Sequence, residues 1–121
     1  MTTTQPRFTD NHDGSVTDAK TGLIWTKATI AVNVDFAGAL AALEPGWRLP
    51  TAEELFTLID RTRFSPAIDD VAFPDTIYRW YLTADKCAWN EDDAVWVVHF
   101  SFGNVDSLHR HHNGCVRAVR S

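Results

Sequence analysis

The sequence contains little cysteine and no long apolar run. Cys87 and Cys115 are its two cysteines, too few for a disulfide scaffold, and their spacing matches no zinc pattern. We therefore expect both thiols to be unpaired. No window approaches the roughly 20 consecutive apolar residues of a membrane span. The opening MTTTQPRF also lacks the regions of a secretory signal, so we expect a location in the cytoplasm or delivery to a surface or virion by another route.

Positive charge is also scarce. The chain has 11 Lys and Arg against 16 Asp and Glu, a formal net charge of -5, and no basic run. Because nucleic-acid binding depends on clustered cations, we expect no nucleic-acid partner. The length of 121 residues and a hydrophobic content of 45% predict one folded domain over residues 1–121.

The first quarter of the chain alternates β-favouring segments with glycine-ending turns. The stretch RFTDNHDGSVTDAKTGLIWTK predicts three short strands, near Phe8, near Val16 and from Leu23 to Trp25. Its TDNHDG segment resembles the start of a calcium loop. However, Thr9 would stand at the first ligand position and Lys20 at the closing glutamate, so we expect no calcium site.

Two helices are predicted in the middle of the chain. Phe36 and Leu40 recur at helical spacing behind a capping Asp35. In WRLPTAEELFTLIDR, Thr51 and Glu54 have the spacing of a capping box, and an apolar stripe follows. These patterns predict a first helix that ends near the PG dipeptide and a second that starts after Thr51.

The segment between the helices carries a tryptophan and an arginine. We expect Trp47 to be wedged into the core, and Arg48 to pair with a carboxylate, either Asp18 or Glu54. Trp89 lies among turn formers and is the tryptophan expected to be exposed. Three further tryptophans in predicted strands are core candidates: Trp25, Trp80 and Trp96.

The last third of the chain is predicted to be β. Strands are expected around Tyr81 and Trp96, followed by a hairpin turn at residues 102–104 and one closing strand, CVRAVR. Alternation places Trp96, Val98 and Phe100 on one face, expected to be the core face. We expect Gly103 and Val105 to continue this core pattern. The opposite face carries Val97, His99 and Ser101.

Five segments together resemble a known family. RFTDNHDGSVTDAKTGLIW, GWRLPTAEEL, SPAIDDVAFP, VWVVHFSFGNV and VRAVR, in this order, are similar to the Lcl C-terminal domain family, named for a bacterial collagen-like adhesin. The resemblance implies an α+β, C-type-lectin-like fold with two helices packed against small twisted antiparallel sheets, and a distant relation to formylglycine-generating, sulfatase-modifying enzymes. Many relatives have a disulfide between the first helix and the final strand. It is missing here, because Ala118 stands at the strand position and the helix has no cysteine.

Two chemical functions are considered and not favoured. An oxidase like the formylglycine-generating enzymes would need the two cysteines close together near the C-terminus, and this chain does not have that pattern. We expect no catalysis and no cofactor. The alternative is a metal site built from His109, His111 and His112, with His99 nearby, although along an extended strand only His109 and His111 share a face.

The favoured function is recognition by a displayed face. In some members of this family and fold, the last hairpin and closing strand are hypervariable and are targets of diversity-generating retroelements, which alter adenines in asparagine-rich codons. The sequence here is compatible with that process. We expect a protein or carbohydrate ligand, such as a sulfated polysaccharide, and no calcium dependence, because the sugar motifs of C-type lectins are absent. The predicted contact residues are Trp89, Val97, His99, Ser101, Phe102, Asp106, Leu108, His109, Arg110, His111, His112 and Asn113.

Overall fold

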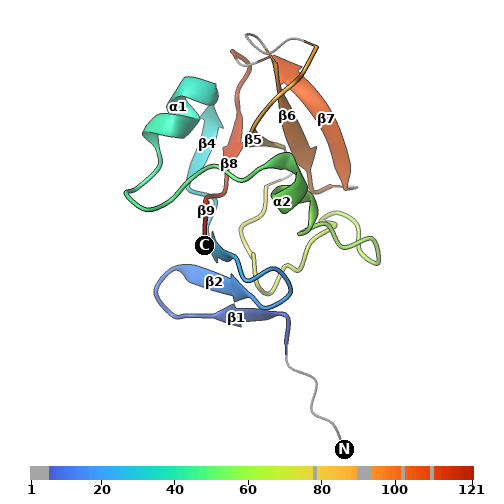
Figure 1. Cartoon of the computed structure of the whole chain (residues 1–121). Helices are drawn as coiled ribbons and strands as arrows, with labels where there is room; N and C mark the ends of the chain where they lie inside the picture. Colours follow the sequence, from blue (N-terminus) through green and yellow to red (C-terminus); the bar gives the residue numbers. More distant parts are fainter. Residues whose placement is uncertain (1–5, 78, 90–93, 102, 110) are drawn as a thin grey trace, which may run out of the picture.

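The computed structural model describes residues 6–77, 79–89, 94–101, 103–109 and 111–121. Within these residues the fold is mixed α+β, with two sheets and two short helices (Figure 1). The four-stranded sheet has the order β1 (Phe8–Asp10), β2 (Ser15–Asp18), β3 (Ile24–Thr26) and β9 (Val119–Arg120). The five-stranded sheet has the order β4 (Ala31–Val34), β8 (Gly114–Val116), β5 (Trp80–Lys86), β6 (Ala94–His99) and β7 (Asn104–His109). The helices are α1 (Phe36–Ala41) and α2 (Ala52–Phe56).

The four-stranded sheet brings the two ends of the described chain together. The meander of three short strands is confirmed, and Gly14 and Gly22 provide the positive φ angles of its two turns, 88° and 77°. Strand β9 then pairs with β3, placing Arg120 opposite Ile24. The first and last strands therefore belong to one sheet, at the lower end of the molecule in Figure 1.

The closing segment forms two strands, so the prediction of one strand is wrong. Strand β8 pairs with β4 and β5 in the five-stranded sheet, whereas β9 pairs with β3 in the other. The chain changes sheets at Arg117 and Ala118, where the Ala118 amide donates to Thr26 Oγ1 at 3.1 Å. Strand β4 was not predicted from the sequence, because Asn33, with a φ of 60°, and a shift in register interrupt its alternation.

Both predicted helix starts are confirmed. The Gly38 amide donates to the Asp35 carboxylate at 2.8 Å. Thr51 and Glu54 form a complete capping box at α2. Helix α2 ends at Phe56, before the end of the predicted apolar stripe.

Arg48 pairs with Glu54, one of the two carboxylates predicted as its partner. The guanidinium of Arg48 donates to both carboxylate oxygens of Glu54, at 2.7 and 2.8 Å. The other candidate, Asp18, is bonded instead to Arg7. The sequence alone could not choose between these two carboxylates.

Apolar side chains cover both faces of the five-stranded sheet. Neighbouring residues of one strand belong to different apolar clusters: Val98 is in the cluster that contains Leu55 of α2, whereas Val97 is in the cluster that contains Ala39 of α1. The prediction that Val97 lies on a displayed face is therefore wrong, since it is fully buried. Val105, expected in the core, is 41% exposed, because its strand lies at the edge of the sheet.

The tryptophans differ in burial. Trp25 is fully buried and Trp89 is exposed, and both observations confirm the predictions. Trp47 is half-buried at the margin of the core, with the Arg120 guanidinium 4.6 Å from its ring, so its predicted position as a core wedge is wrong. Trp80 and Trp96 are also half-buried. Among the described residues, no helix is long and apolar enough to cross a membrane.

Candidate functional site

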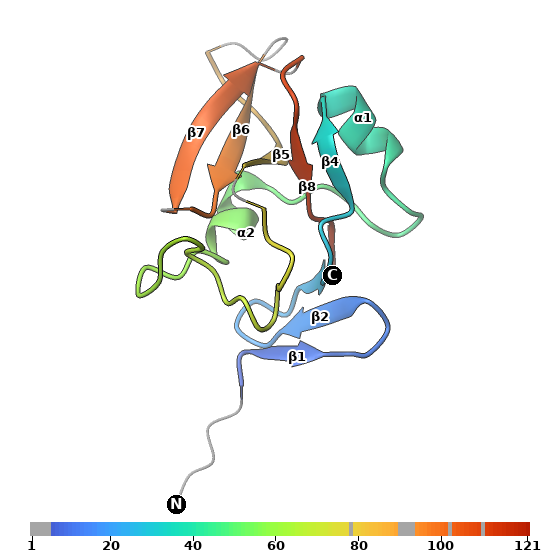
Figure 2. The same ribbon diagram turned by 180° about the vertical axis from the view of Figure 1, so that it is seen from behind.

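The predicted contact residues are divided between two ends of the five-stranded sheet. Ala94 pairs with His109 where β6 begins and β7 ends, and His99 pairs with Asn104 at the opposite end. Figure 2 shows the arrow of β7 pointing toward the first of these ends. Six residues of strand extend over roughly 17 Å, so one small ligand cannot reach both ends. Phe102 and Arg110 lie outside the described residues.

We call the first end the histidine end, defined by Trp89, His109, His111, His112 and Asn113. All five side chains are exposed, and 67% of the Trp89 surface is accessible. Trp89 lies in the turn that follows β5, close in sequence to Cys87, whose amide donates to the carbonyl of Ala94, the partner of His109. The sheet register thus brings a tryptophan and three histidines, from separate segments, to the same end.

The histidines at this end are arranged around His109. Its ring centroid lies 5.1 Å from that of His111 and 5.8 Å from that of His112. The His111 amide donates to Nδ1 of His109 at 3.3 Å, and the His112 amide donates to the His109 carbonyl at 2.9 Å. Local backbone contacts therefore fix the turn and leave its imidazoles at the surface.

A cavity of about 290 Å³ adjoins the histidine turn. Its lining combines His111 with residues at the start of α1: Asp35, Phe36, Ala37 and Leu40. Leu40 is 50% exposed, although it sits on the apolar stripe of the helix. The Asp35 carboxylate accepts a hydrogen bond from the Gly38 amide. The cavity thus has apolar walls and an imidazole, a combination typical of ligand-binding surfaces.

The opposite end of the sheet is packed against other parts of the chain. His99 is half-buried, with its ring 5.0 Å from that of Trp80, and its Nδ1 accepts a hydrogen bond from the Ser101 amide. The Ser101 carbonyl accepts from the Ser65 amide at 2.6 Å. A Cβ atom at Gly103 would lie 2.8 Å from the Ile59 side chain. These contacts give His99 and Ser101 a packing role, so the predicted display does not extend to this end.

Two predicted contact residues lie between the ends, on edge strand β7. Asp106 is exposed, opposite the buried Val97. Leu108 is half-buried and packs against the apolar cluster that contains Val97. Of these two side chains, Asp106 is the better placed for a ligand.

The structure also bears on the two functions that were not favoured. Within the described ranges, no group of three or more His, Cys, Asp or Glu side chains is placed to hold a metal ion. Both cysteines are free, which confirms the prediction, and both are buried. Burial raises the pKa of the Cys87 and Cys115 thiols, which disfavours the reactive thiolate.

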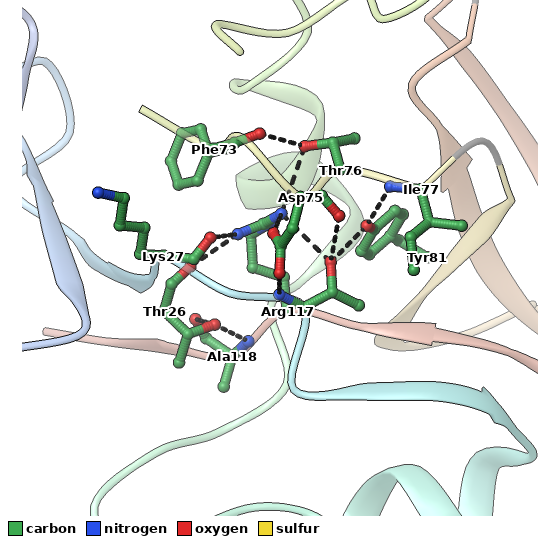
Figure 3. A network of polar contacts seen from close by, with 10 residues as sticks. Thr26, Lys27, Phe73, Asp75, Thr76, Ile77, Tyr81, Arg117 and Ala118 are labelled. Carbon is green, nitrogen blue, oxygen red and sulfur yellow. Dashed lines mark hydrogen bonds and ion pairs between the residues drawn. The ribbon is translucent and has the colours of Figure 1, made fainter. Parts of the chain in front are cut away.

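Arg117 is a fully buried charged residue that no pattern in the sequence had indicated. Its guanidinium donates to the carbonyl oxygens of Thr26 and Lys27, at 2.8 and 2.5 Å, and to Thr76 Oγ1 at 3.3 Å (Figure 3). Asp75 is its acidic partner, at 3.5 Å. Burial lowers the pKa of Arg117, against the opposing influence of Tyr81 and Asp75. These contacts link the end of β3 to the loop before β5, and we assign Arg117 a structural role.

Comparison with known proteins places most of the chain in one family model. The model described as the Lcl C-terminal domain matches residues 14–120. The match includes both helices and every named strand except β1. No curated protein matches the chain.

Proposed function

The chain belongs to the Lcl C-terminal domain family, and we propose that it is a non-catalytic recognition module with a C-type-lectin-like fold. The proposal rests on one observation, the gathering of exposed Trp89 and three exposed histidines at the histidine end. The fold assignment is supported by the pairing of the first and last strands within one sheet, beside two short helices. The distant relation to formylglycine-generating enzymes would then concern the fold alone.

The ligand that best suits the histidine end is a carbohydrate or a protein surface. An exposed indole offers a flat apolar face with a hydrogen-bond donor at its edge, and tryptophan is enriched at binding hot spots. Histidines gain positive charge between neutral and mildly acidic pH. A sulfated polysaccharide should therefore bind more tightly as the pH falls, whereas a basic protein should bind more weakly.

Binding to heparin and to desulfated heparin, measured at pH 7.5 and 5.5, tests this proposal. We expect sulfated heparin to bind more tightly at pH 5.5. The triple variant His109→Ser, His111→Ser, His112→Ser should remove this pH dependence, and Trp89→Ala should weaken binding at both pH values. The matched control is His12→Asn, which changes an exposed histidine in the β1–β2 turn at a φ of 59°, an angle that asparagine tolerates.

Three results would separate the alternatives. If the triple variant unfolds, the histidines are structural and the proposal is wrong. Failure of the wild type to bind heparin or a glycan array would exclude carbohydrate and favour a protein ligand. Tight binding of Zn²⁺ that the triple variant abolishes would instead favour the metal-site alternative.

We further propose that this module is diversified by a retroelement or serves as an adhesin-type domain. Support for diversification comes from the exposed residues 111–113, whereas the buried Val97 is a poor target for variation. Inspection of the gene neighbourhood tests it. A reverse transcriptase gene beside a near-copy of the 3′ end of this gene is expected. Its absence would leave adhesion as the proposed role.

A further inference from the structure

A second cavity, distant from the histidine end, lies between the β1–β2 hairpin and the loop that follows α2. It has a volume of about 390 Å³ and is lined by the start of β1, the turn after β2 and the loop that follows α2. Figure 1 shows this loop, coloured green to yellow, beside the β1–β2 hairpin. Three basic residues line the cavity, Arg7, Lys20 and Arg61, although the protein as a whole is acidic.

Arg7 is held rigidly at this cavity. Its Nε and Nη2 atoms donate to the two carboxylate oxygens of Asp18, each at 2.9 Å, and Nη2 also donates to the Thr57 carbonyl at 2.9 Å. The guanidinium carbon lies 4.6 Å from the centre of the Phe8 ring. Within the described chain, Nη1 has no hydrogen-bond acceptor. A fixed guanidinium with open donors can bind an oxyanion at little further cost in conformational entropy.

The N–H donors of the other two basic side chains of the cavity are also not paired with a carboxylate among the described residues. Neither Lys20 nor Arg61 has a carboxylate oxygen within 4.0 Å among the residues described. The Arg61 guanidinium lies 5.6 Å from the centre of the Phe56 ring. Since both side chains are exposed, they can turn toward a ligand in the cavity.

The two carboxylates that line the cavity, Asp60 and Asp69, accept hydrogen bonds from residues that follow them closely in the sequence. Asp60 accepts hydrogen bonds from the amide and hydroxyl of Thr62, at 2.9 and 2.6 Å, and from Nε of Arg63 at 3.1 Å. Asp69 accepts from the Val71 and Ala72 amides, each at 3.0 Å. Among the described contacts, three of the four carboxylate oxygens thus already accept hydrogen bonds, whereas donors on Arg7, Lys20 and Arg61 remain open. This imbalance favours a ligand that supplies acceptor oxygens.

Apolar side chains complete the walls. Leu58 is buried, and Phe8 and Ile59 are half-buried beside it. We propose that the cavity binds a small organic oxyanion, a carboxylate or sulfate attached to an apolar group. The anionic head contacts Arg7, Lys20 and Arg61, and the apolar part lies against Phe8, Leu58 and Ile59. This site is separate from the histidine end and does not depend on the function proposed for it.

Titration of the whole chain with benzoate, benzamide and inorganic sulfate at constant ionic strength tests the proposal, with amide chemical shifts as the readout. Benzoate carries both required features, benzamide has the same shape without the charge, and sulfate has the charge without the ring. We expect saturable binding of benzoate, with shifts at residues 7–8, 20 and 58–61. Sulfate should bind more weakly at the same residues, and benzamide should not bind.

The double variant Lys20→Gln, Arg61→Gln should weaken benzoate binding by about tenfold or more, because it removes two charge-assisted contacts. Its control is Lys86→Gln, Arg79→Gln, which removes the same net charge at two exposed positions outside the cavity. The control should bind benzoate as the wild type does. Equal losses in both variants, equal binding of benzamide, or no saturable binding of either anion would overturn the proposal.

Discussion

The guanidinium carbon of Arg117 lies 4.7 Å from the centre of the Phe73 ring, and both side chains are fully buried. The Nη1 atom donates to the carbonyl oxygens of Thr26 and Lys27, at the end of β3. The Nη2 atom donates to the Thr29 and Thr76 hydroxyls and contacts the Asp75 carboxylate. A single side chain at the point where the strand changes sheets therefore fastens two segments that are far apart in the sequence.

Replacement of Arg117 by Met should reduce the free energy of unfolding by about 3 kcal/mol, because the carbonyl oxygens that it serves would be left buried without donors. Arg117→Lys should recover only part of this loss, since one ammonium group cannot reach both segments. Urea denaturation gives both values. The control, Arg79→Lys at an exposed site, should be neutral. A loss below about 0.5 kcal/mol for Arg117→Met, the range of surface substitutions, would contradict the fastening role.

Acid should destabilise the protein through Asp18. Burial alone would raise the pKa of this carboxyl, but hydrogen bonds from Arg7, the Lys20 amide and Thr21 outweigh burial and hold the pKa below its ordinary value. A group whose pKa is lowered by folding contributes stability above its unfolded pKa, about 3.9 for Asp, and loses it as the pH falls further.

Asp18→Asn should therefore lower the free energy of unfolding by about 2 kcal/mol at pH 7. The difference from the wild type should shrink below about pH 4, the region of the unfolded pKa. Unfolding curves measured between neutral and acidic pH check this. Asp70→Asn, at an exposed pair with Arg63, is the control and should have a small effect at all pH values. A constant difference for Asp18→Asn down to the lowest pH would show that the pair does not respond to acid as predicted.

The two tryptophans at different depths should respond differently to truncation. Trp25→Ala removes a fully buried side chain and should cost roughly 3–5 kcal/mol. Trp47→Ala removes a half-buried ring and one cation–π contact, and should cost about 2 kcal/mol. Thermal and urea unfolding provide the comparison. Equal costs would mean that Trp47 supports the core as deeply as Trp25 does.

The capping box of α2 should be worth about 1 kcal/mol, the usual effect of losing an N-cap hydroxyl. Thr51→Ala removes the acceptor that the Glu54 amide uses at 3.1 Å, whereas Thr51→Ser keeps it. Urea unfolding of both variants should show the loss only for alanine. If serine costs as much as alanine, the lost methyl group and not the cap is responsible.

Neither thiol should react in the folded protein. Cys87 and Cys115 are buried and free, and burial raises the pKa of both, which lowers the fraction of reactive thiolate. A chromogenic disulfide reagent should titrate both thiols only after denaturation, and reducing agent should leave the unfolding midpoint unchanged. Rapid labelling of either thiol in the native state would mean that the residues around it unfold locally and expose it.

Local signals in the sequence were sufficient for several features. Turn glycines predicted the β1–β3 meander, and the spacing of Thr51 and Glu54 predicted the start of α2. Trp89 was predicted to be exposed because turn formers surround it. Each of these depends on residues within a few positions of one another, where backbone geometry and capping act without help from the rest of the fold.

The divided contact face could not be predicted in the same way. Alternation along β6 places Val97 and Val98 on opposite faces, but whether a face is solvent or core depends on what packs against it. The cluster that Val97 joins contains Leu49 and Ala39 of α1, and the cluster that Val98 joins contains Leu55 of α2. A period-two pattern shows which residues share a face of the strand, but it does not show whether other elements pack on both faces.

The sequence by itself determined the helix starts, the short N-terminal strands and the exposed tryptophan, because these follow from local propensity and spacing, and the family resemblance implied the mixed α+β class. Only the tertiary structure decided that the closing segment divides between two sheets, that Arg117 is buried where it does so, and that Arg7, Lys20 and Arg61 share one cavity. These features join residues that are tens of positions apart, and they exist only once packing has chosen which distant segments meet.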